Sequence, residues 1–306
     1  MKIYHDVTET VGQTPLVRIN KISPEGETIW AKLECFNPCS SVKDRLGVAM
    51  VKAAENTGRV GPDTTFIEAT SGNTGIGLAV ACAAKGYRLT IVMPEDMSEE
   101  RKQLLKALGA DLILTPKEEG IPGAVKRAEE LARENPRYIQ TRQFDNPVNP
   151  LIHEQTTARE IWEDTDGQVE VVVAGVGTGG TLTGIARFLK GKRPDIAIVA
   201  VEPASSAVLS GEPRGPHAIQ GIGAGFIPPV CDLNLIDHII AISDEDAFAM
   251  TRRLAREEGI FAGISSGAAL AAALYLIDEG VIAGKNIVVI LPDGGDRYLS
   301  TGVFGE

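Results

Sequence analysis

One lysine in the sequence stands where an amine could do chemistry. The stretch SVKDR (41–45) places Lys43 between a hydroxyl residue and a carboxylate. Ser41 followed three residues later by Asp44 resembles a capping box, so Lys43 is expected in the first turn of a helix. The positive end of the helix dipole favours a neutral amine there, and a neutral lysine can act as a nucleophile or form a Schiff base. The alternative is a solvated charge on a well-capped surface helix.

A glycine-rich turn between a predicted strand and a predicted helix is the second candidate site. In EATSGNTGIG (68–77), the backbone amides of the turn could bind an anion, and Ser71, Asn73 and Thr74 add polar side chains. A tight, capped turn would explain the glycines but not this series of polar residues. The pattern therefore favours ligand binding.

A third segment, AGVGTGGTLTG, leaves two interpretations open. Gly175, Gly177 and Gly180 match G-x-G-x-x-G, and Glu202 ends the next predicted strand, where a dinucleotide-binding unit has its acidic ribose ligand. The same loop could equally bind one isolated phosphate through its backbone amides.

Two other motifs fail on inspection. Ser265 lies in GISSG, which matches a hydrolase nucleophile elbow, but that fold needs a histidine after the serine and the last histidine is His238. HEQTT (153–157) begins like a zinc-protease helix, but Thr157 stands where the second histidine must be. We therefore predict neither a serine hydrolase nor a zinc protease.

The four cysteines indicate neither a disulfide scaffold nor a metal site. Cys35, Cys39, Cys82 and Cys231 are too few for the first and lack the paired Cys-x-x-Cys spacing of the second. We interpret them as reduced thiols that pack in the interior, and we predict no metal.

The elements that position these motifs alternate between short apolar runs and amphipathic segments. This alternation predicts βαβ units and largely parallel sheets, hence an α/β fold. The predicted elements of the first half are strands at 65–69, 88–93, 110–115 and 137–141 and helices at 74–85, 98–109 and 124–135.

A turn-rich segment, FDNPVNP (144–150), indicates a domain boundary near residue 146. Beyond it, apolar runs predict strands at 169–177, 196–202 and 286–292. The stretch 209–229 is too rich in glycine and proline to be regular, and a loop of that length is usually functional.

Composition excludes several classes of protein. A chain of 306 residues exceeds the usual size of one core, so one large domain or two joined domains are expected. A net charge of −11 argues against nucleic-acid and anionic-membrane partners. No apolar run is long enough to span a membrane, and the N-terminus lacks a secretion signal, so we expect a soluble, cytoplasmic protein.

Seven motifs cover nearly the whole chain: GQTPLVRIN (12–20), NPCSSVKDR (37–45), EATSGNTGIGLA (68–79), GVGTGGTLTG (175–184), GPHAIQGIGAGFIP (215–228), AGISSGAA (262–269) and GDRYLSTGVFG (295–305). Taken in this order, they resemble the cysteine synthase (O-acetylserine sulfhydrylase) family. The resemblance implies a pyridoxal 5'-phosphate (PLP) enzyme of fold type II, similar to the β subunit of tryptophan synthase, with two α/β domains and mostly parallel twisted sheets. An NAD-dependent dehydrogenase becomes a distant alternative.

The resemblance also implies a role for each candidate residue. Lys43 would hold PLP as an internal aldimine and serve as base and acid, and Ser266 would face the pyridine nitrogen. Asn73 would hydrogen-bond the cofactor's ring oxygen. The implied phosphate-binding residues are Gly177, Thr178, Gly179, Gly180 and Thr181, and the implied residues for the substrate carboxylate are Thr70, Ser71, Gly72, Asn73, Thr74 and Gln143.

The implied reaction is a β-replacement. O-acetyl-L-serine loses acetate to give an aminoacrylate, and sulfide adds to it to form L-cysteine. A neutral serine opposite the pyridine nitrogen leaves the ring a shallow electron sink, which favours loss of a β-leaving group over transamination. The alternatives are a related β-replacement that uses O-phosphoserine or another sulfur donor, including a cystathionine β-synthase-like reaction.

The resemblance finally predicts the organisation of the chain and its partners. Residues 1–12 and 36–146 would form a smaller, mobile domain, and residues 13–35 and 147–306 a larger one, with PLP in the cleft between them. Similar enzymes are homodimers, and many bind the C-terminal tail of serine acetyltransferase.

Overall fold

The chain folds into two compact units. The computed structural model describes residues 3–70 and 72–305. The first unit comprises Met1–Val11 and Asn37–Asn149, and the second comprises Gly12–Phe36 and Pro150–Glu306.

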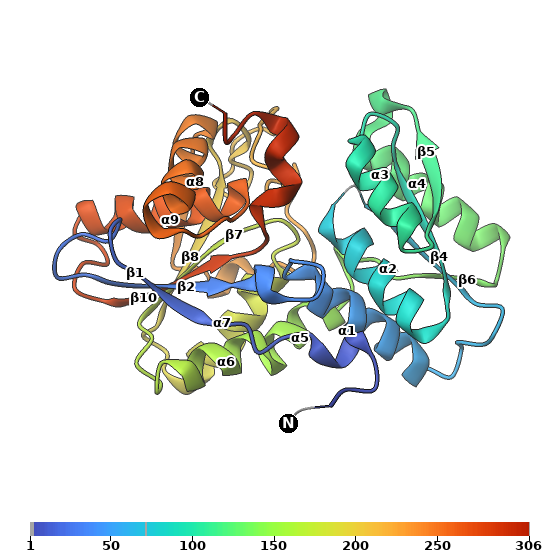
Figure 1. Ribbon diagram of the computed structural model, residues 1–306, viewed down its shortest axis with the longest axis horizontal. Coiled ribbons are helices and arrows are strands. Elements are labelled where there is room, and N and C mark those ends of the chain that lie inside the picture. The colour runs from blue at the N-terminus through green and yellow to red at the C-terminus, as the bar shows by residue number, and fades with distance from the viewer. Residues whose placement is uncertain (1–2, 71, 306) are drawn as a thin grey trace. The chain divides into compact units, whose positions relative to one another are not determined.

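The first unit is built on a four-stranded sheet in the order β5-β4-β3-β6, in which every pair is parallel (Figure 1). Its strands are β3 (Thr65–Ala69), β4 (Arg88–Pro94), β5 (Asp111–Thr115) and β6 (Tyr138–Gln140). Its helices are α1 (Lys43–Asn56), α2 (Asn73–Lys85), α3 (Glu99–Ala107) and α4 (Gly120–Glu134), with short 3-10 turns η1 (Val7–Thr10) and η3 (Lys117–Glu119). Helix α5 (Val148–Gln155) begins at the end of this unit.

The strands and helices predicted for this half of the chain are confirmed, with one shifted boundary. Ser98 caps α3 as expected, because its side-chain oxygen accepts a hydrogen bond from the Arg101 N–H at 3.4 Å. Helix α4 begins at Gly120 rather than at residue 124. The segment Gly-Ile-Pro-Gly has the composition of a turn, but proline is well tolerated in the first turn of a helix, where its missing N–H has no partner to lose.

Helices α1 and α2 pack against each other at very short distance, through glycines. A Cβ atom on Gly47 would collide with the backbone of Gly77, and a Cβ on Gly77 would collide with the carbonyl group of Lys43. Glycine inside a helix costs about 0.5–1 kcal/mol relative to alanine. The two glycines therefore indicate that the helices must approach closely. This close packing holds α2 beside the first turn of α1.

The second unit is built on a six-stranded sheet in the order β1-β2-β10-β7-β8-β9, in which only the β1–β2 pair is antiparallel. Its strands are β1 (Leu16–Ile19), β2 (Thr28–Leu33), β7 (Val171–Gly175), β8 (Ala197–Pro203), β9 (His238–Ile242) and β10 (Asn286–Leu291). Its helices are α6 (Thr157–Asp164), α7 (Gly180–Lys192), α8 (Asp244–Glu258) and α9 (Ile264–Asp278), with 3-10 turns η2 (Glu34–Phe36), η4 (Ala204–Ser206), η5 (Leu233–Leu235) and η6 (Gly295–Thr301). The α/β class with mostly parallel sheets is thus confirmed.

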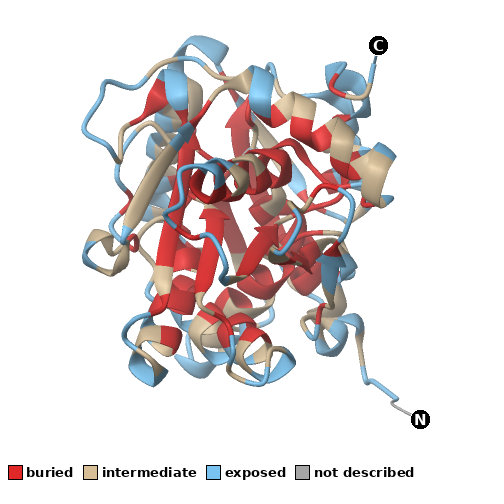
Figure 2. Cartoon of the chain, turned by 90° about the vertical axis from the view of Figure 1, so that its left-hand side faces the viewer, coloured by how far each residue is buried: buried red, intermediate tan, exposed pale blue. Residues whose placement is uncertain are grey.

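The inner strands β7, β8 and β10 of the six-stranded sheet are buried at nearly every position, and Figure 2 draws buried strands in red, whereas the edge strands β1 and β9 are partly exposed. Along β7, Val171 and Val173 belong to one apolar cluster, while Val172 and Ala174 belong to the cluster on the opposite face. Successive side chains of a strand point to opposite faces, so a strand covered on both sides is apolar at every position. This explains the uninterrupted apolar run in the sequence.

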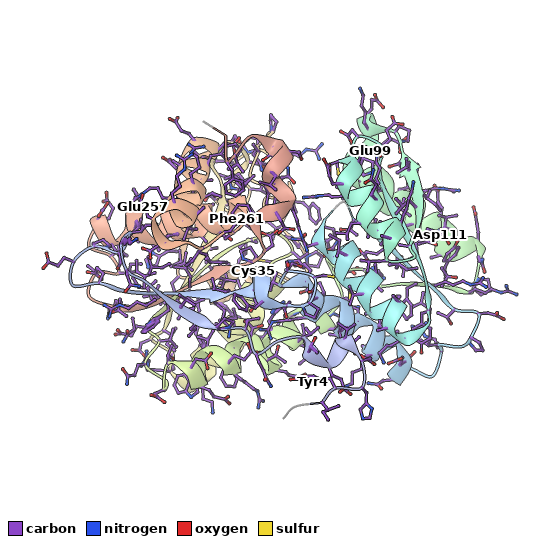
Figure 3. The ribbon with its side chains drawn as sticks, in the orientation of Figure 1. Tyr4, Cys35, Glu99, Asp111, Glu257 and Phe261 are labelled. Carbon is purple, nitrogen blue, oxygen red and sulfur yellow. The ribbon has the colours of Figure 1, made fainter. Side chains whose placement is uncertain are left out.

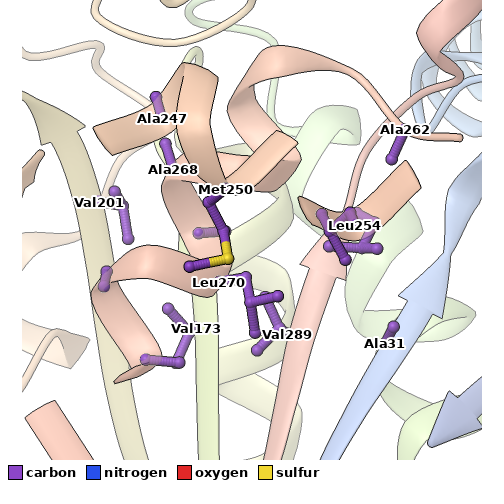
Figure 4. Close-up of a cluster of buried hydrophobic side chains, with 14 of the residues drawn as sticks. Ala31, Val173, Val201, Ala247, Met250, Leu254, Ala262, Ala268, Leu270 and Val289 are labelled. Atoms are coloured by element: carbon purple, nitrogen blue, oxygen red, sulfur yellow. The ribbon is translucent and has the colours of Figure 1, made fainter. Parts of the chain in front are cut away.

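Helices α8 and α9 supply much of the cover on one face. Figure 4 shows Met250 and Leu254 of α8 and Leu270 of α9 beside Val173 and Val289 of the sheet, and all five belong to one buried cluster. The N-terminus of α9 is thereby held in place against the sheet.

The long segment predicted to be irregular is irregular. From Ala207 to Asp232 the described chain forms neither helix nor strand. In the part of the chain that the structure describes, no helix is long and apolar enough to cross a membrane.

The close contact between α1 and α2 leads to a testable prediction. We expect Gly77→Ala to destabilise the protein by about 1–3 kcal/mol, because the new methyl group has to push α2 away from Lys43. Equilibrium denaturation in urea measures the change. Gly61→Ala is the matched control, since a Cβ there meets no atom within 4 Å. Equal stability of the two variants would contradict this account.

Candidate active site

Lys43 is the first residue of α1 and is half-buried, so its predicted place in the first helical turn is confirmed. The predicted capping box is wrong in detail. The N-cap residue is Val42, without a side-chain cap bond. Ser41 Oγ accepts from the Lys43 N–H at 3.2 Å, and Asp44 Oδ2 accepts from the Cys39 N–H at 2.6 Å. The helix starts later than the pattern predicts, because Asp44 secures the preceding loop instead of the residue before the helix.

The turn between β3 and α2 brings several predicted residues together. Thr70 follows β3, and its backbone N–H donates to the Val92 carbonyl at 3.1 Å, which extends the pairing with β4. Its hydroxyl accepts from the Gly72 N–H at 3.1 Å. Gly72 is the N-cap residue and Asn73 the first residue of α2. The predicted residue Ser71 lies outside the described residues.

Gln143 joins this turn although it is distant in sequence. Strand β6 pairs with β3 in parallel, so the residues that follow both strands lie at the same edge of the sheet. Gln143 Oε1 accepts a hydrogen bond from the Thr74 hydroxyl at 2.6 Å, and its Nε2 donates to the Ala69 carbonyl at 3.4 Å. Thr74 and Gln143 are both buried. The structure therefore assembles Thr70, Gly72, Asn73, Thr74 and Gln143 around the N-terminus of one helix.

Glu68 is a buried acid that sequence reasoning missed. It is the penultimate residue of strand β3, just before this site. Its carboxylate accepts hydrogen bonds from the Thr141 hydroxyl and from the Gln143 N–H. Burial raises the pKa of Glu68 to about 7, and these hydrogen bonds only partly oppose that rise. The signal available in the sequence was a carboxylate inside the apolar run TFIEA.

The second unit holds the other predicted set, the glycine loop between β7 and α7. Gly179, the N-cap residue of α7, has left-handed backbone (φ 80), and a Cβ there would collide with Cys231. A Cβ on Gly177 would collide with the carbonyl oxygen of Gly221. The Thr178 hydroxyl accepts from the Gly180 N–H at 3.3 Å. The glycine loop thus lies at the positive end of a 13-residue helix, a position that suits a phosphate.

His153 supports this loop. It is fully buried; its Nε2 lies 3.2 Å from the hydroxyl of Thr181, and its Nδ1 lies 2.9 Å from the hydroxyl of Thr157. The sequence analysis considered His153 only as a zinc ligand. Its spacing from Thr157 holds a clue, since positions i and i+4 lie side by side on helical backbone.

Ser266 lies in the first turn of α9 and is fully buried. Its hydroxyl oxygen has no hydrogen-bond partner among the described residues. A buried polar atom without a partner is costly and indicates that a ligand supplies one.

The dinucleotide interpretation of the glycine loop fails at Glu202. This residue is buried in β8, where its carboxylate accepts from the Leu209 N–H at 2.7 Å and from both the N–H and the hydroxyl of Ser210, at 3.1 and 2.6 Å. Both carboxylate oxygens already hold the long irregular segment, and the side chain is buried rather than open to a ribose. The loop therefore serves a single phosphate better than a dinucleotide.

The four cysteines are free thiols. Burial raises the pKa of Cys82 to about 12 and that of Cys231 to about 11, and it also raises that of Cys35, which Figure 3 labels directly after β2. Protonated thiols are weak nucleophiles, so these three have packing roles. Within residues 3–70 and 72–305, no group of three or more His, Cys, Asp or Glu side chains is placed to hold a metal ion.

Comparison with known proteins gives the family. Residues 7–293 match the model of the pyridoxal-phosphate dependent enzymes. The chain belongs to this family. Its resemblance to cysteine synthases is confirmed as well, since it is 55% identical to cysteine synthase A of Escherichia coli (strain K12) over 100% of this chain and 97% of that protein.

Solved structures of related enzymes also resemble this chain. Cysteine synthase (OASS) from Entamoeba histolytica superposes with a TM-score of 0.96 at 48% identity, over 100% of this chain and 92% of that one. An O-acetylserine dependent cystathionine β-synthase from Helicobacter pylori has a TM-score of 0.93 at 42% identity, over 99% of this chain and 100% of that one. The predicted fold type II and the PLP cofactor are thus confirmed.

The raised pKa of Glu68 predicts how stability varies with pH. Because the folded-state pKa of about 7 exceeds the ordinary glutamate value of 4.5, the folded protein binds this proton more tightly than the unfolded chain. Its contribution to stability is present in acid and is lost as the pH rises through 7. Between pH 5 and 8 we expect the unfolding free energy of the wild type to fall by about 2 kcal/mol relative to Glu68→Gln, measured by urea denaturation. A constant difference between the two proteins would contradict the raised pKa.

Proposed function

We propose that this protein is a cysteine synthase, which forms L-cysteine from O-acetyl-L-serine and sulfide with PLP as its cofactor. The observation that carries the proposal is the position of Lys43 at the start of α1, which packs through glycines against α2. The first turn of α2 contains Thr74, which donates a hydrogen bond to Gln143. Full-length identity of 55% to a cysteine synthase supports the choice of reaction.

The residues present fit PLP. The loop from Gly177 to Thr181 suits the cofactor phosphate, because it is glycine-rich and leads into the N-terminus of α7, where backbone amides and the helix dipole favour an anion. The buried Ser266 hydroxyl, without a partner among the described residues, suits the pyridine nitrogen. Asn73 is assigned to the ring oxygen. We propose that these residues of both units serve one cofactor, which Lys43 binds through its side-chain nitrogen.

Bound PLP supplies an electron sink for negative charge that develops at the α-carbon of the amino acid substrate. Lys43 then acts as the proton carrier, removing the α-proton and returning it after the new bond has formed. Ser266 is a neutral partner for the ring nitrogen and keeps the sink shallow. Protonation at the wrong carbon is thereby disfavoured and loss of the acetate group is favoured.

The substrate α-carboxylate is assigned to the turn before α2. Its ligands in this proposal are Thr70, Ser71, Gly72, Asn73, Thr74 and Gln143. The positive end of the dipole of this 13-residue helix stabilises a carboxylate bound at its N-terminus. In a chain with a net charge of −11, this local positive end is what attracts an anionic group.

The next question is which sulfur donor and which serine derivative the enzyme uses. A structural neighbour at 42% identity is named as an O-acetylserine dependent cystathionine β-synthase, so the same scaffold serves a bulkier thiol in that protein. O-phosphoserine is a further alternative for the first substrate. Sulfide and O-acetyl-L-serine remain our assignment because of the higher identity to cysteine synthases.

We also propose that the protein is a cytoplasmic homodimer whose first unit is mobile and closes over substrate. A carboxylate-binding turn open to an amino acid can also receive the C-terminal carboxylate of a peptide. We therefore propose the C-terminal tail of serine acetyltransferase as a partner that competes with O-acetyl-L-serine.

Absorption spectroscopy on the purified protein tests the cofactor and the reaction. We expect a visible band of the lysine-bound cofactor that shifts to longer wavelength on addition of O-acetyl-L-serine and returns on addition of sulfide. Lys43→Ala should lack the starting band and lose cysteine formation by at least about a thousandfold. Parallel assays with O-phosphoserine and with homocysteine compare the alternative substrates.

Two results would contradict the proposal. A wild-type protein that stays colourless after incubation with PLP would exclude the cofactor role of Lys43. A coloured protein that responds to homocysteine but not to sulfide would replace cysteine formation by cystathionine formation.

The partner assignment predicts competition. A synthetic peptide with the C-terminal sequence of serine acetyltransferase should raise the apparent KM for O-acetyl-L-serine and leave kcat unchanged, because it binds the same turn. The same peptide with an amidated C-terminus is the control. Sedimentation velocity on the protein alone should give the mass of a dimer. Inhibition by both peptides alike, or a monomer mass, would contradict these assignments.

A further inference from the structure

We propose that Glu68 is a positioning residue for the amino acid substrate: its carboxylate holds the backbone of residues 141–143 so that the Gln143 side chain reaches Thr74. This inference rests on the proposed function, since it concerns the same carboxylate-binding turn. Glu68 itself contacts neither cofactor nor substrate in this proposal and acts through Gln143.

Three donors from one short segment converge on the Glu68 carboxylate. The Thr141 hydroxyl donates to Oε2, the Gln143 N–H donates to Oε1 at 3.4 Å, and the backbone N–H of Arg142 also bonds to the carboxylate. Glu68 is 3% exposed, so water cannot take the place of its carboxylate oxygens as acceptors for these donors. Only an ionised carboxylate offers two acceptor oxygens and no competing donor.

The segment needs such an anchor because its backbone is strained. Arg142 has left-handed backbone (φ 57), which is unfavourable for a residue with a side chain. Strain of this kind persists where the surroundings hold it. Asn146 Nδ2 donates to the Thr141 carbonyl at 2.7 Å and Asn149 Nδ2 to the Gln143 carbonyl at 2.8 Å, so these two asparagines fix the carbonyls while Glu68 fixes the N–H groups.

The held segment presents Gln143 to the substrate site. Gln143 Oε1 accepts from Thr74 in the first turn of α2, and its Nε2 donates to the carbonyl of Ala69, the residue that follows Glu68 in β3. The path from Glu68 to Thr74 therefore consists of hydrogen bonds within one unit. If Glu68 no longer accepts from the backbone, the left-handed turn can relax and Gln143 can leave Thr74.

Steady-state kinetics of Glu68→Gln at pH 8 tests the proposal. Glutamine keeps the size of the side chain but has a single acceptor oxygen. We expect the KM for O-acetyl-L-serine to rise about tenfold, the cost of weakening one charge-assisted hydrogen-bond group. The KM for sulfide, kcat and the absorbance of the bound cofactor should stay within roughly twofold, because none of them depends on Gln143.

A second pair of variants keeps the proposal testable if Glu68→Gln fails to fold. Thr141→Val removes the hydroxyl that donates to Glu68, whereas Thr141→Ser retains it. We expect a higher KM for O-acetyl-L-serine in the valine variant and a value close to the wild type in the serine variant. A general loss of stability would instead lower the content of folded, coloured enzyme.

A double-mutant cycle separates positioning from a merely structural role. In a Gln143→Ala background, Glu68→Gln should change the KM for O-acetyl-L-serine by less than about twofold, since the side chain that Glu68 positions is gone. Additive effects in the cycle, or an unchanged KM in both Glu68→Gln and Thr141→Val, would overturn the inference. If the wild type itself forms no cysteine, the proposed function has failed instead.

Discussion

The positive end of the helix dipole at helix N-termini is the physical feature on which this protein depends. Four helices begin at candidate site residues: α1 at Lys43, α2 at Asn73, α7 at Gly180, and α9 two residues before Ser266. The first turn of a helix carries a partial positive charge and donors without internal partners. In a strongly acidic chain, these turns supply the positive potential that an anionic cofactor and an amino acid substrate need.

Buried carboxylates secure the loops around these helix starts. Glu68 binds the segment after β6, Glu202 binds the start of the long irregular segment, and Asp44 binds the loop before α1. Each accepts a hydrogen bond from backbone N–H groups that no strand or helix satisfies. A buried acceptor with two oxygens can thus give irregular backbone a defined shape, which side-chain packing alone does not achieve in segments poor in apolar residues.

Sequence reasoning succeeded where the signal was local. Periodicity located the strands and most helix ends, and residue types identified Ser98 as a cap. For the glycine loop, residue types left both a dinucleotide and a single phosphate open as ligands. It failed where the partner lies far along the chain. His153 and Glu68 gained no role because Thr181 and Thr141 are 28 and 73 residues away. The capping box expected of Ser41 and Asp44 fails for a local reason, because Asp44 accepts from the Cys39 N–H while Ser41 accepts from the Lys43 N–H.

By itself the sequence determined the α/β class and the motifs that indicate a PLP enzyme, and it singled out Lys43 as the candidate amine, because these depend on periodicity and on residue types within short windows. Only the tertiary structure decided which distant residues complete the candidate site in the first unit. Parallel pairing of β3 with β6 brings Gln143 to Thr74, and close packing at Gly47 and Gly77 sets α2 beside the start of α1. Such contacts depend on how strands and helices pack, which no local pattern records.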